Sequence, residues 1–274
     1  MTKRRAVFYL LIAVIGFSTS GVLVKLTTLD ALALTAGRSI VAGAVFWAYL
    51  GRPHFARSIA QVGGGLAFVG AQVFFVAATQ LTSAANAILL QYTAPIYVAV
   101  FGFWFLGERV RRLDWAAMLV IGAGMAFFFA GDLTQSGLLG NVYAILSGAS
   151  LAWLVLFMRK QKDGSPLETV LVGSIFAALL GAPSLLRSTP TMNDWLIILF
   201  LGVVQLGIPF ILYSLAIRRL EAVEAILIQA LEPILNPIWV FLAIDERPSR
   251  QALLGGALVL TAVTGRALLA ARRR

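Results

Sequence analysis

The sequence predicts an all-α polytopic membrane protein, with ten transmembrane helices arranged as two inverted repeats of five. Hydrophobic residues make up 60% of the 274 residues and charged residues 12%, whereas soluble domains have about 45–50% and about 25%. The apolar residues also form long uninterrupted runs, and one stretch of the chain occurs twice. A soluble core of this size could not bury the apolar excess, so a bilayer is the expected solvent.

The charged residues fall in short clusters between ten apolar runs, each near the length of about 20 residues that a helix needs to cross a bilayer. The runs cover about residues 7–26, 31–50, 60–79, 84–106, 112–131, 138–158, 167–186, 194–216, 223–244 and 250–269. Little chain remains for a soluble domain. Lys3-Arg4-Arg5 before an apolar run also resembles a signal peptide, but that run reaches a full span and no A-x-A site follows it.

The repeat lies in residues 84–109 and 222–247, at an offset of 138. Ten of the 26 aligned positions are identical, including Gln91/Gln229, Pro95/Pro233 and the closing pair Glu108-Arg109/Glu246-Arg247. Apolar helices share Ala, Ile and Leu by chance, but a Gln four residues before a Pro and an acid–base pair thirteen residues later are specific. We therefore divide the chain into two repeats, residues 1–133 and 138–274.

Cationic residues predict how the spans are oriented. With the N-terminus in the cytoplasm, the outside loops hold three cationic residues and the cytoplasmic segments hold sixteen, namely Lys3, Arg4, Arg5, Arg52, Arg57, Arg109, Arg111, Arg112, Arg159, Lys160, Lys162, Arg218, Arg219, Arg272, Arg273 and Arg274. This positive-inside bias places both termini in the cytoplasm. Because each repeat has an odd number of spans, the second repeat inserts upside down relative to the first. Inverted repeats are a transporter architecture, with a duplicated structural bundle as the alternative.

A glutamine precedes a proline by four residues in three of the spans: Gln91 and Pro95, Gln205 and Pro209, Gln229 and Pro233. Proline frees the carbonyl four residues earlier, and in hydrocarbon that carbonyl needs a partner. Polar kinks that face the bundle interior are one interpretation, and kinks sealed by neighbouring helices are the other. In the ninth span Pro237 follows Pro233 by one turn, so this helix is expected to bend or unwind near mid-membrane.

Glu232 is the acid that lies deepest in a predicted span. A charge there costs about 2.5–3.5 kcal/mol on insertion scales, so this acid must be protonated, paired or wet. It is a candidate proton carrier or contact for a substrate ammonium group, and otherwise a structural partner for a cation such as Lys25 or Arg38. Those two cations could attract a carboxylate, or they could extend to the outer headgroups.

Aromatic side chains could form a box around an amphipathic solute, although membrane aromatics usually serve packing or interfacial roles. The candidates are Phe17, Tyr92, Tyr97, Trp153, Tyr213 and Trp239. From these and the polar residues we predict a substrate site made of Gln91, Tyr92, Trp153, Tyr213, Gln229 and Glu232. The charge or coupling candidates are Glu232, Arg38 and Lys25, and the kink or gating candidates are Pro95, Pro209, Pro233 and Pro237.

Other chemistry is sparse. The chain has no phosphate-binding GxxxxGK[ST] motif, no cysteine and a single histidine, His54. We therefore expect no enzyme activity, no cofactor and no metal site. Most of the cationic residues behind the net charge of +10 lie in the predicted cytoplasmic segments, so nucleic acid is not an expected partner. A membrane-embedded enzyme acting on a lipid would need clustered acids or histidines at one face, which the chain does not supply.

Three features carry a family resemblance. They are the ten spans as five plus five, Arg38 in the second span, and the repeated ending from Pro95 to Glu108-Arg109 and from Pro233 to Glu246-Arg247. The chain resembles the drug/metabolite transporter superfamily, EamA type, over essentially its whole length, and looks most like the YddG-type exporters of aromatic amino acids. One departure is Asp245, where the family often has the glycine seen at Gly107.

The resemblance implies a multi-pass protein of the bacterial inner membrane. It also implies a central cavity lined by spans one, three, four, six, eight and nine. The expected function is export of small amphipathic metabolites, amino acids including aromatic ones, by alternating access. Export of cationic drugs or other metabolites, and a non-transporting structural or regulatory role, are the alternatives. The expected partners are a small-molecule substrate and the lipid bilayer. The protein is expected to function as a monomer, with a dimer as the alternative.

Overall fold

The computed structural model describes residues 1–56, 58–82, 84–128, 137–235 and 250–272, and all regular structure in these ranges is helical. By length and composition, 6 helical segments can cross a membrane: Ala31–Leu50, Ile59–Leu81, Ala87–Leu106, Leu138–Lys160, Pro166–Arg187 and Met192–Ile217. This is the architecture of a polytopic membrane protein.

The first half of the chain contains α1 (Lys3–Phe17), α2 (Ser20–Leu26), α3 (Ala31–Leu50), α4 (Ile59–Leu81), α5 (Ala84–Gln91), α6 (Ala94–Leu106) and α7 (Arg112–Phe128). The second contains α8 (Leu138–Lys160), α9 (Pro166–Arg187), α10 (Met192–Phe200), the π-helical segment η1 (Leu201–Gly207), α11 (Ile208–Ile217), α12 (Ala222–Gln229) and α14 (Arg250–Arg272). At the offset of the sequence repeat, α5 and α12 begin and end at equivalent residues, and α7 and α14 begin at equivalent residues.

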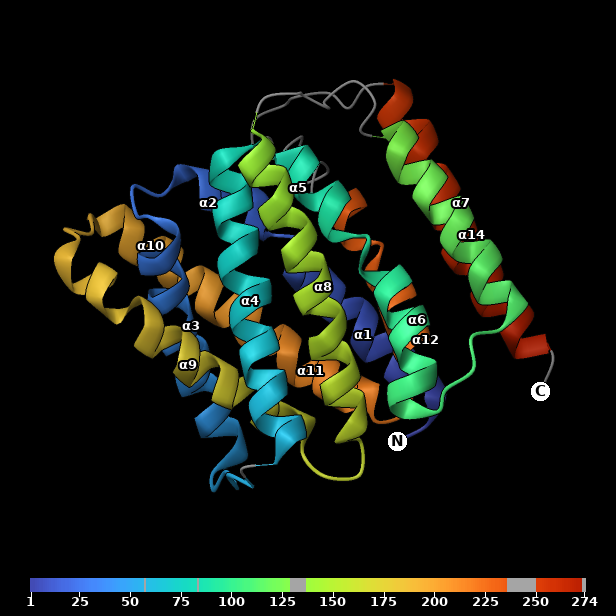
Figure 1. Ribbon diagram of the computed structural model, residues 1–274, viewed down its shortest axis with the longest axis horizontal. Coiled ribbons are helices and arrows are strands. Elements are labelled where there is room, and N and C mark those ends of the chain that lie inside the picture. The colour runs from blue at the N-terminus through green and yellow to red at the C-terminus, as the bar shows by residue number, and fades with distance from the viewer. Residues whose placement is uncertain (57, 83, 129–136, 236–249, 273–274) are drawn as a thin grey trace.

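The two halves pack against each other reciprocally (Figure 1). α4 of the first half lies along α8 of the second, and the equivalent helices, α11 and α1, also lie together. α3 packs on its equivalent α9, and α7 on its equivalent α14. The helices of one half therefore find their main partners in the other.

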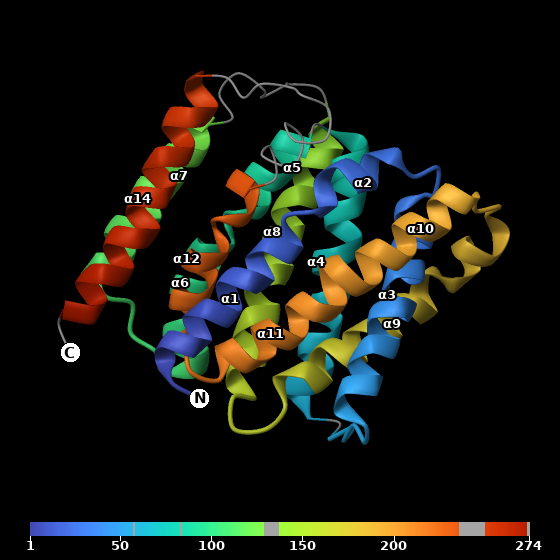
Figure 2. The same cartoon turned by 180° about the vertical axis from the view of Figure 1, so that it is seen from behind.

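The α7–α14 pair stands at one side of the bundle, and Figure 2 shows the same separation from behind. The two helices run antiparallel: Asp114 near the start of α7 contacts Arg266 near the end of α14, and Gly124 lies against Val259. Segments related by the repeat thus run in opposite directions where they meet.

Several spans are interrupted, and three of the interruptions lie at glutamines. α5 ends at Gln91 and α6 begins at Ala94; α12 ends at Gln229 and helix resumes at residue 232. Gln205 lies in η1, four residues before Pro209 in the first turn of α11. The regular backbone hydrogen bonds of the α-helix are interrupted in the π-helical turn and at the two breaks. Backbone N–H and C=O groups near these residues can therefore bond other partners.

The first predicted span, residues 7–26, is also not one continuous helix, because α1 ends at Phe17 and α2 begins at Ser20. No proline is involved. The Ser18 hydroxyl donates to the Ile15 carbonyl at 2.7 Å, and the Thr19 hydroxyl donates to the Gly16 carbonyl at 2.8 Å. These side chains compete with the backbone ladder and allow the helix to bend.

Two glycines permit local geometry that other residues would obstruct. A Cβ on Gly148 of α8 would lie 2.5 Å from the Gln91 carbonyl oxygen, so α8 can cross the α5–α6 break at this distance only with glycine there. Gly107 ends α6 with a left-handed φ of 71°. This turn places Glu108 at the end of the bundle where α1 begins. The repeat-equivalent Asp245 lies outside the described residues.

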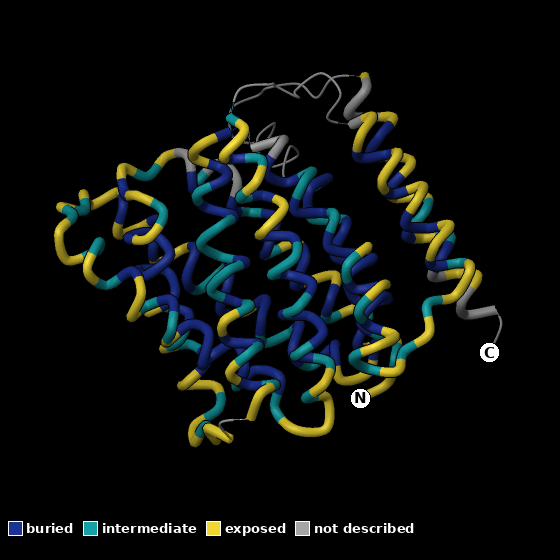
Figure 3. The backbone as a smooth tube through the Cα atoms, in the orientation of Figure 1, coloured by how far each residue is buried: buried dark blue, intermediate teal, exposed yellow. Residues whose placement is uncertain are grey.

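Buried residues follow the inner faces of the helices (Figure 3). Many large apolar side chains are exposed. Trp104 is 77% exposed, Leu119 73% and Leu138 79%. In water such side chains would be a liability, whereas in a bilayer they contact acyl chains. The apolar exterior therefore agrees with membrane embedding.

Candidate functional site

A cavity lies inside the bundle where the interrupted helices meet. Its volume, counted as the space that the centre of a water molecule can reach, is about 40 Å³. A single water needs roughly 10–15 Å³ on this measure. The lining residues come from the six spans implied by the family resemblance: Phe17, Ser20, Ala71, Gln72, Phe75, Gln91, Leu151, Gln205, Phe210, Gln229 and Glu232. Both halves of the chain contribute to it.

The three glutamines of the Gln-x-x-x-Pro pattern all line this cavity. Gln91 donates through Nε2 to the Ser147 hydroxyl at 2.7 Å, and that hydroxyl donates to the Ala71 carbonyl at 2.8 Å. Gln91 is thereby fixed against α4 and α8. Gln205 and Gln229 are buried, yet the Oε1 atom of each has no hydrogen-bond partner in the described part of the chain.

Unpaired buried amide oxygens are costly, by about 1–3 kcal/mol each when nothing satisfies them. Beside a cavity with room for water, they can accept hydrogen bonds from water or from a ligand donor. Tyr213 adds a hydroxyl of the same kind, since its buried Oη has no partner among the described residues. Its ring packs 6.3 Å from those of Phe17 and Phe210, which line the cavity.

Tyr92 and Glu232 form the polar contact between the two helix breaks. Tyr92 Oη lies 2.9 Å from Glu232 Oε2 and 2.8 Å from the Gln229 carbonyl oxygen, so its proton is shared between two acceptors. Gln229 Nε2 lies 3.5 Å from the same Glu232 oxygen. The carboxylate lines the cavity and its contacts are neutral donors. It is therefore available to a cation that enters the cavity.

Arg38 of α3 is fully buried. Its Nη2 donates to Gln72 Oε1 at 2.7 Å, and the Gln72 carbonyl oxygen lies at 3.4 Å. Gln72 lines the cavity, so one amide side chain separates this guanidinium group from the cavity. Arg38 Nε and Nη1 have no partner in the described ranges.

The structure brings some of the predicted residues together and leaves others apart. Trp153 does not line the cavity; its ring stacks on Phe101 at 5.2 Å and contacts Phe105 and Phe157 in a separate aromatic cluster. The prolines of the kink set lie at the interruptions or in the first turn after them: Pro95, Pro209 and Pro233. Pro237 and the Lys25 side chain lie outside what the structure describes.

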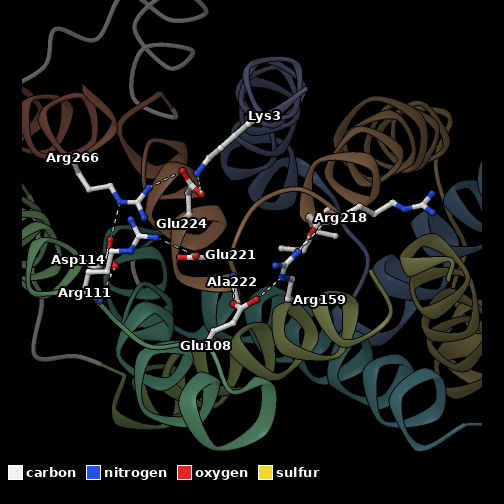
Figure 4. Close-up of polar contacts among 11 residues, drawn as sticks. Lys3, Glu108, Arg111, Asp114, Arg159, Arg218, Glu221, Ala222, Glu224 and Arg266 are labelled. Carbon is white, nitrogen blue, oxygen red and sulfur yellow. Dashed lines mark hydrogen bonds and ion pairs between the residues drawn. The ribbon is translucent and has the colours of Figure 1, made fainter. Parts of the chain in front are cut away.

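Ion pairs join the two halves at the end of the bundle where α1 begins (Figure 4). Arg266 lies between two acids: its Nε is 2.8 Å from Asp114 Oδ1 and its Nη1 is 2.9 Å from Glu224 Oε1. Lys3 Nζ also pairs with Glu224, at 2.6 Å. The Arg266 and Asp114 side chains are 7% and 2% exposed, so this is a buried pair.

A second contact of the same kind centres on Glu108. Its Oε1 accepts from Arg159 Nε at 2.6 Å, and its Oε2 accepts from the Ala222 backbone N–H at 2.9 Å (Figure 4). Arg159 also donates to the Ile217 carbonyl at 3.0 Å. A single carboxylate from the first half thus ties α8, α11 and the start of α12 together.

Sequence reasoning missed Gln72, Asp114 and Arg266 as members of these clusters. Gln72 has no proline near it, and the only signal was an amide in the middle of an apolar helix. Arg266 was detectable as a cation far inside the last apolar run, where a charge needs a partner. Its pairing with Asp114, across 152 residues of sequence, was not readable.

Within the described residues no group of three or more His, Asp or Glu side chains is placed to hold a metal ion. The polar groups that line the cavity are four glutamine amides, the Ser20 hydroxyl and the Glu232 carboxylate. Tyr92, Tyr213 and Arg38 are not among the lining residues, although each contacts one that is. All of these are hydrogen-bonding and charge-pairing groups, suited to reversible binding.

Comparison with known proteins identifies relatives over most of the chain. The EamA-like transporter family matches twice, over residues 4–130 and 138–266. An uncharacterized transporter of Archaeoglobus fulgidus is 31% identical over 194 residues, which is 69% of each chain. The threonine/homoserine exporter RhtA of Escherichia coli is 24% identical over 210 residues, covering 74% of this chain and 69% of RhtA.

The aromatic amino acid exporter YddG of Ancylobacter novellus is 24% identical over 217 residues, covering 76% of this chain and 75% of that protein. A solved crystal structure superimposes with a TM-score of 0.81 at 21% identity, covering 98% of this chain and 99% of the other. At that identity the superposition speaks for the fold alone.

Proposed function

Because the chain belongs to the EamA-like transporter family of the drug/metabolite transporter superfamily, we propose that it exports small amphipathic metabolites across the bacterial inner membrane. The proposed substrates are amino acids, including aromatic ones, and the proposed mechanism is alternating access. The observation that carries the proposal is the cavity between the halves, where the three kink glutamines meet Glu232.

The proposed topology is ten spans in two inverted repeats, residues 1–133 and 138–274, with both termini in the cytoplasm. Support comes from the equivalence of α5 with α12, from the antiparallel contact of α7 with its equivalent α14, and from the cationic bias of the loops. Inverted repeats provide two related conformations, each open to one side, around a site at their interface.

The cavity chemistry fits an amphipathic solute. Phe17, Phe75 and Phe210 supply apolar surface, whereas the free amide oxygens of Gln205 and Gln229 accept hydrogen bonds. Glu232 offers the negative charge that an ammonium group requires. A volume of about 40 Å³ holds a few waters and no amino acid, so the described conformation must widen to bind substrate.

The ion pairs around Glu108 and Arg266 are proposed to close the cytoplasmic end in this conformation. They join residues of opposite halves, and rocking of one half against the other would separate them. The helix breaks beside the cavity, at Gln91, Gln229 and η1, are proposed to absorb the bending.

Counterflow in proteoliposomes tests the function. Proteoliposomes that contain the purified protein are loaded with unlabelled phenylalanine or threonine. Uptake of the labelled amino acid is then compared with uptake by liposomes without protein. Accumulation that depends on internal substrate supports the exporter, and a panel of amino acids then defines the range. Absence of counterflow for amino acids, sugars and cationic compounds alike would refute the transporter assignment.

Export of organic cations is a second candidate, favoured by Glu232, which has neutral donors around it and no cationic partner among the described residues. The same counterflow panel separates the two. Movement of cationic dyes without movement of amino acids would replace the first candidate by the second.

A further inference from the structure

The most unusual charged group outside the contacts used above is Arg38. It is fully buried in α3, and Nε and Nη1, which together carry three N–H donors, have no acceptor in the described ranges. Two neighbouring hydroxyls on the same helix, Thr35 Oγ1 and Ser39 Oγ, are buried and unpartnered as well. The guanidinium group therefore keeps three N–H donors and a positive charge that no described residue satisfies.

Such a charge is costly in a low-dielectric interior unless an anion lies against it. None of the acids that the structure describes forms an ion pair with Arg38. Asp114 and Glu224 pair with Arg266, Glu108 pairs with Arg159, and Glu232 accepts from Tyr92. Arg38 contacts only the neutral oxygens of Gln72.

Gln72 connects this charge to the cavity. Its Oε1 accepts from Arg38 Nη2 at 2.7 Å, and its side chain lines the cavity wall. An amide oxygen and a carboxylate oxygen accept from guanidinium in the same way, but the carboxylate adds charge and a second oxygen for the donor fork. A carboxylate that displaced the Gln72 side chain would therefore be favoured at this position.

We propose that Arg38 is the carboxylate-binding group of the substrate site, screened by Gln72 until substrate enters. Glu232 holds the ammonium group at the same cavity, so the site takes zwitterionic α-amino acids in preference to amines or acids. This inference rests on the proposed transport function and adds the two charged side chains that anchor the amino acid. One positive and one negative anchor leave no net charge in the occupied site.

The test is Gln72→Glu, which is nearly isosteric and gives Arg38 a permanent internal carboxylate. In counterflow competition, wild-type protein should prefer phenylalanine over phenylalanine methyl ester and over phenethylamine. In the variant, phenylalanine should lose at least about tenfold in apparent affinity, while the ester and the amine keep theirs or improve. Gln80→Glu makes the same change on α4 at an exposed side chain that bonds the Leu29 carbonyl, and it should leave the preference unchanged.

Stability gives a second, independent readout. Because Gln72→Glu neutralises a buried unpaired charge, the thermal midpoint of the purified variant should equal or exceed that of the wild type. A clearly lower midpoint would mean that Arg38 is already neutralised, and it would overturn the inference. Arg38→Lys keeps the charge and loses the planar fork, so it should weaken phenylalanine more than phenethylamine.

The outcomes separate the transport function from the carboxylate anchor. A wild-type protein that moves no amino acid overturns the proposed function, and the carboxylate anchor with it. An active wild type whose preference for phenylalanine over phenethylamine is unchanged in Gln72→Glu leaves the transporter intact and overturns the anchor alone.

Discussion

Tyr92 of the first half donates to the carboxylate of Glu232 in the second, with 2.9 Å between Oη and Oε2. The two residues stand at positions where the sequence repeat is not kept: the equivalents of Tyr92 and Glu232 are Ala230 and Ala94. Duplication therefore supplied the two helix breaks, and divergence supplied the polar contact between them. The asymmetry of the cavity arises at these positions.

Glu232→Gln should reduce counterflow of ammonium-bearing substrates by at least about tenfold, equivalent to about 1.4 kcal/mol in the transport step. The amide oxygen can still accept from Tyr92, so the amount of folded protein should stay near that of the wild type. Fluorescence-detected gel filtration and transport per molecule measure the two effects. Asp163→Asn, in the exposed α8–α9 loop, is the matched control. Loss of folded protein with unchanged activity per molecule would assign Glu232 a structural role.

Glu108→Gln should open the end of the bundle where α1 begins, because it removes the charge that holds Arg159 and the Ala222 N–H. The chain has no cysteine, so Ser20→Cys at the cavity wall provides a single labelling site. Labelling by a membrane-impermeant thiol reagent applied at the N-terminal side should rise several-fold in the Glu108→Gln background.

The control for this gate is Glu221→Gln. Glu221 pairs with Arg111 at 3.5 Å, with side chains 36% and 51% exposed, and exposed pairs contribute only about 0–1 kcal/mol. Equal labelling of Ser20→Cys in the Glu108→Gln and Glu221→Gln backgrounds would show that Glu108 does not hold this end closed.

Arg266→Met should destabilise the protein by about 3–5 kcal/mol, the usual cost of removing one partner from a buried ion pair. It leaves Asp114 without its cation and Glu224 with Lys3 alone. The measurement is the thermal midpoint in detergent. Arg250→Met changes an exposed arginine at the start of the same helix and should have little effect. Similar midpoints for the two variants would rule out a stabilising role for the Arg266 cluster.

Asp30, the N-cap of α3, should make stability depend on pH. Burial alone would raise its pKa, but hydrogen bonds from the Ser184 hydroxyl and from the Ala33 and Leu32 N–H groups lower the pKa below its ordinary value of 3.8. A carboxyl with a lowered folded-state pKa stabilises the fold above its unfolded pKa, and this contribution is lost as the pH falls through the lowered value.

Asp30→Asn keeps a capping side chain and removes the titration. The thermal midpoint of the wild type should therefore exceed that of the variant at neutral pH by a few degrees, and the two should converge as the pH falls below 3.8 through the lowered pKa of Asp30. Parallel curves over that range would show that Asp30 does not contribute to the acid sensitivity.

Helix breaks could be predicted from the sequence where they depend on residues close together along the chain. A proline acts on the carbonyl one turn earlier, so the breaks after Gln91 and Gln229 were readable from spacing alone. The break at Ser18 and Thr19 was not, since hydroxyls interrupt a helix only in some contexts. Side-chain direction was also unreadable: Trp153 and Leu151 are two residues apart on α8, yet only Leu151 lines the cavity. That choice is made by the helices packed around them.

The reciprocal packing of the halves constrains biosynthesis. α3, α4 and α7 have their main partners in α9, α8 and α14, all of which are made later. During translation the early helices must therefore remain in the bilayer with their contact faces towards lipid until the later ones are inserted. A truncated chain would expose these faces and the lone Arg38 charge to membrane quality control, so complete synthesis is a condition for escaping degradation.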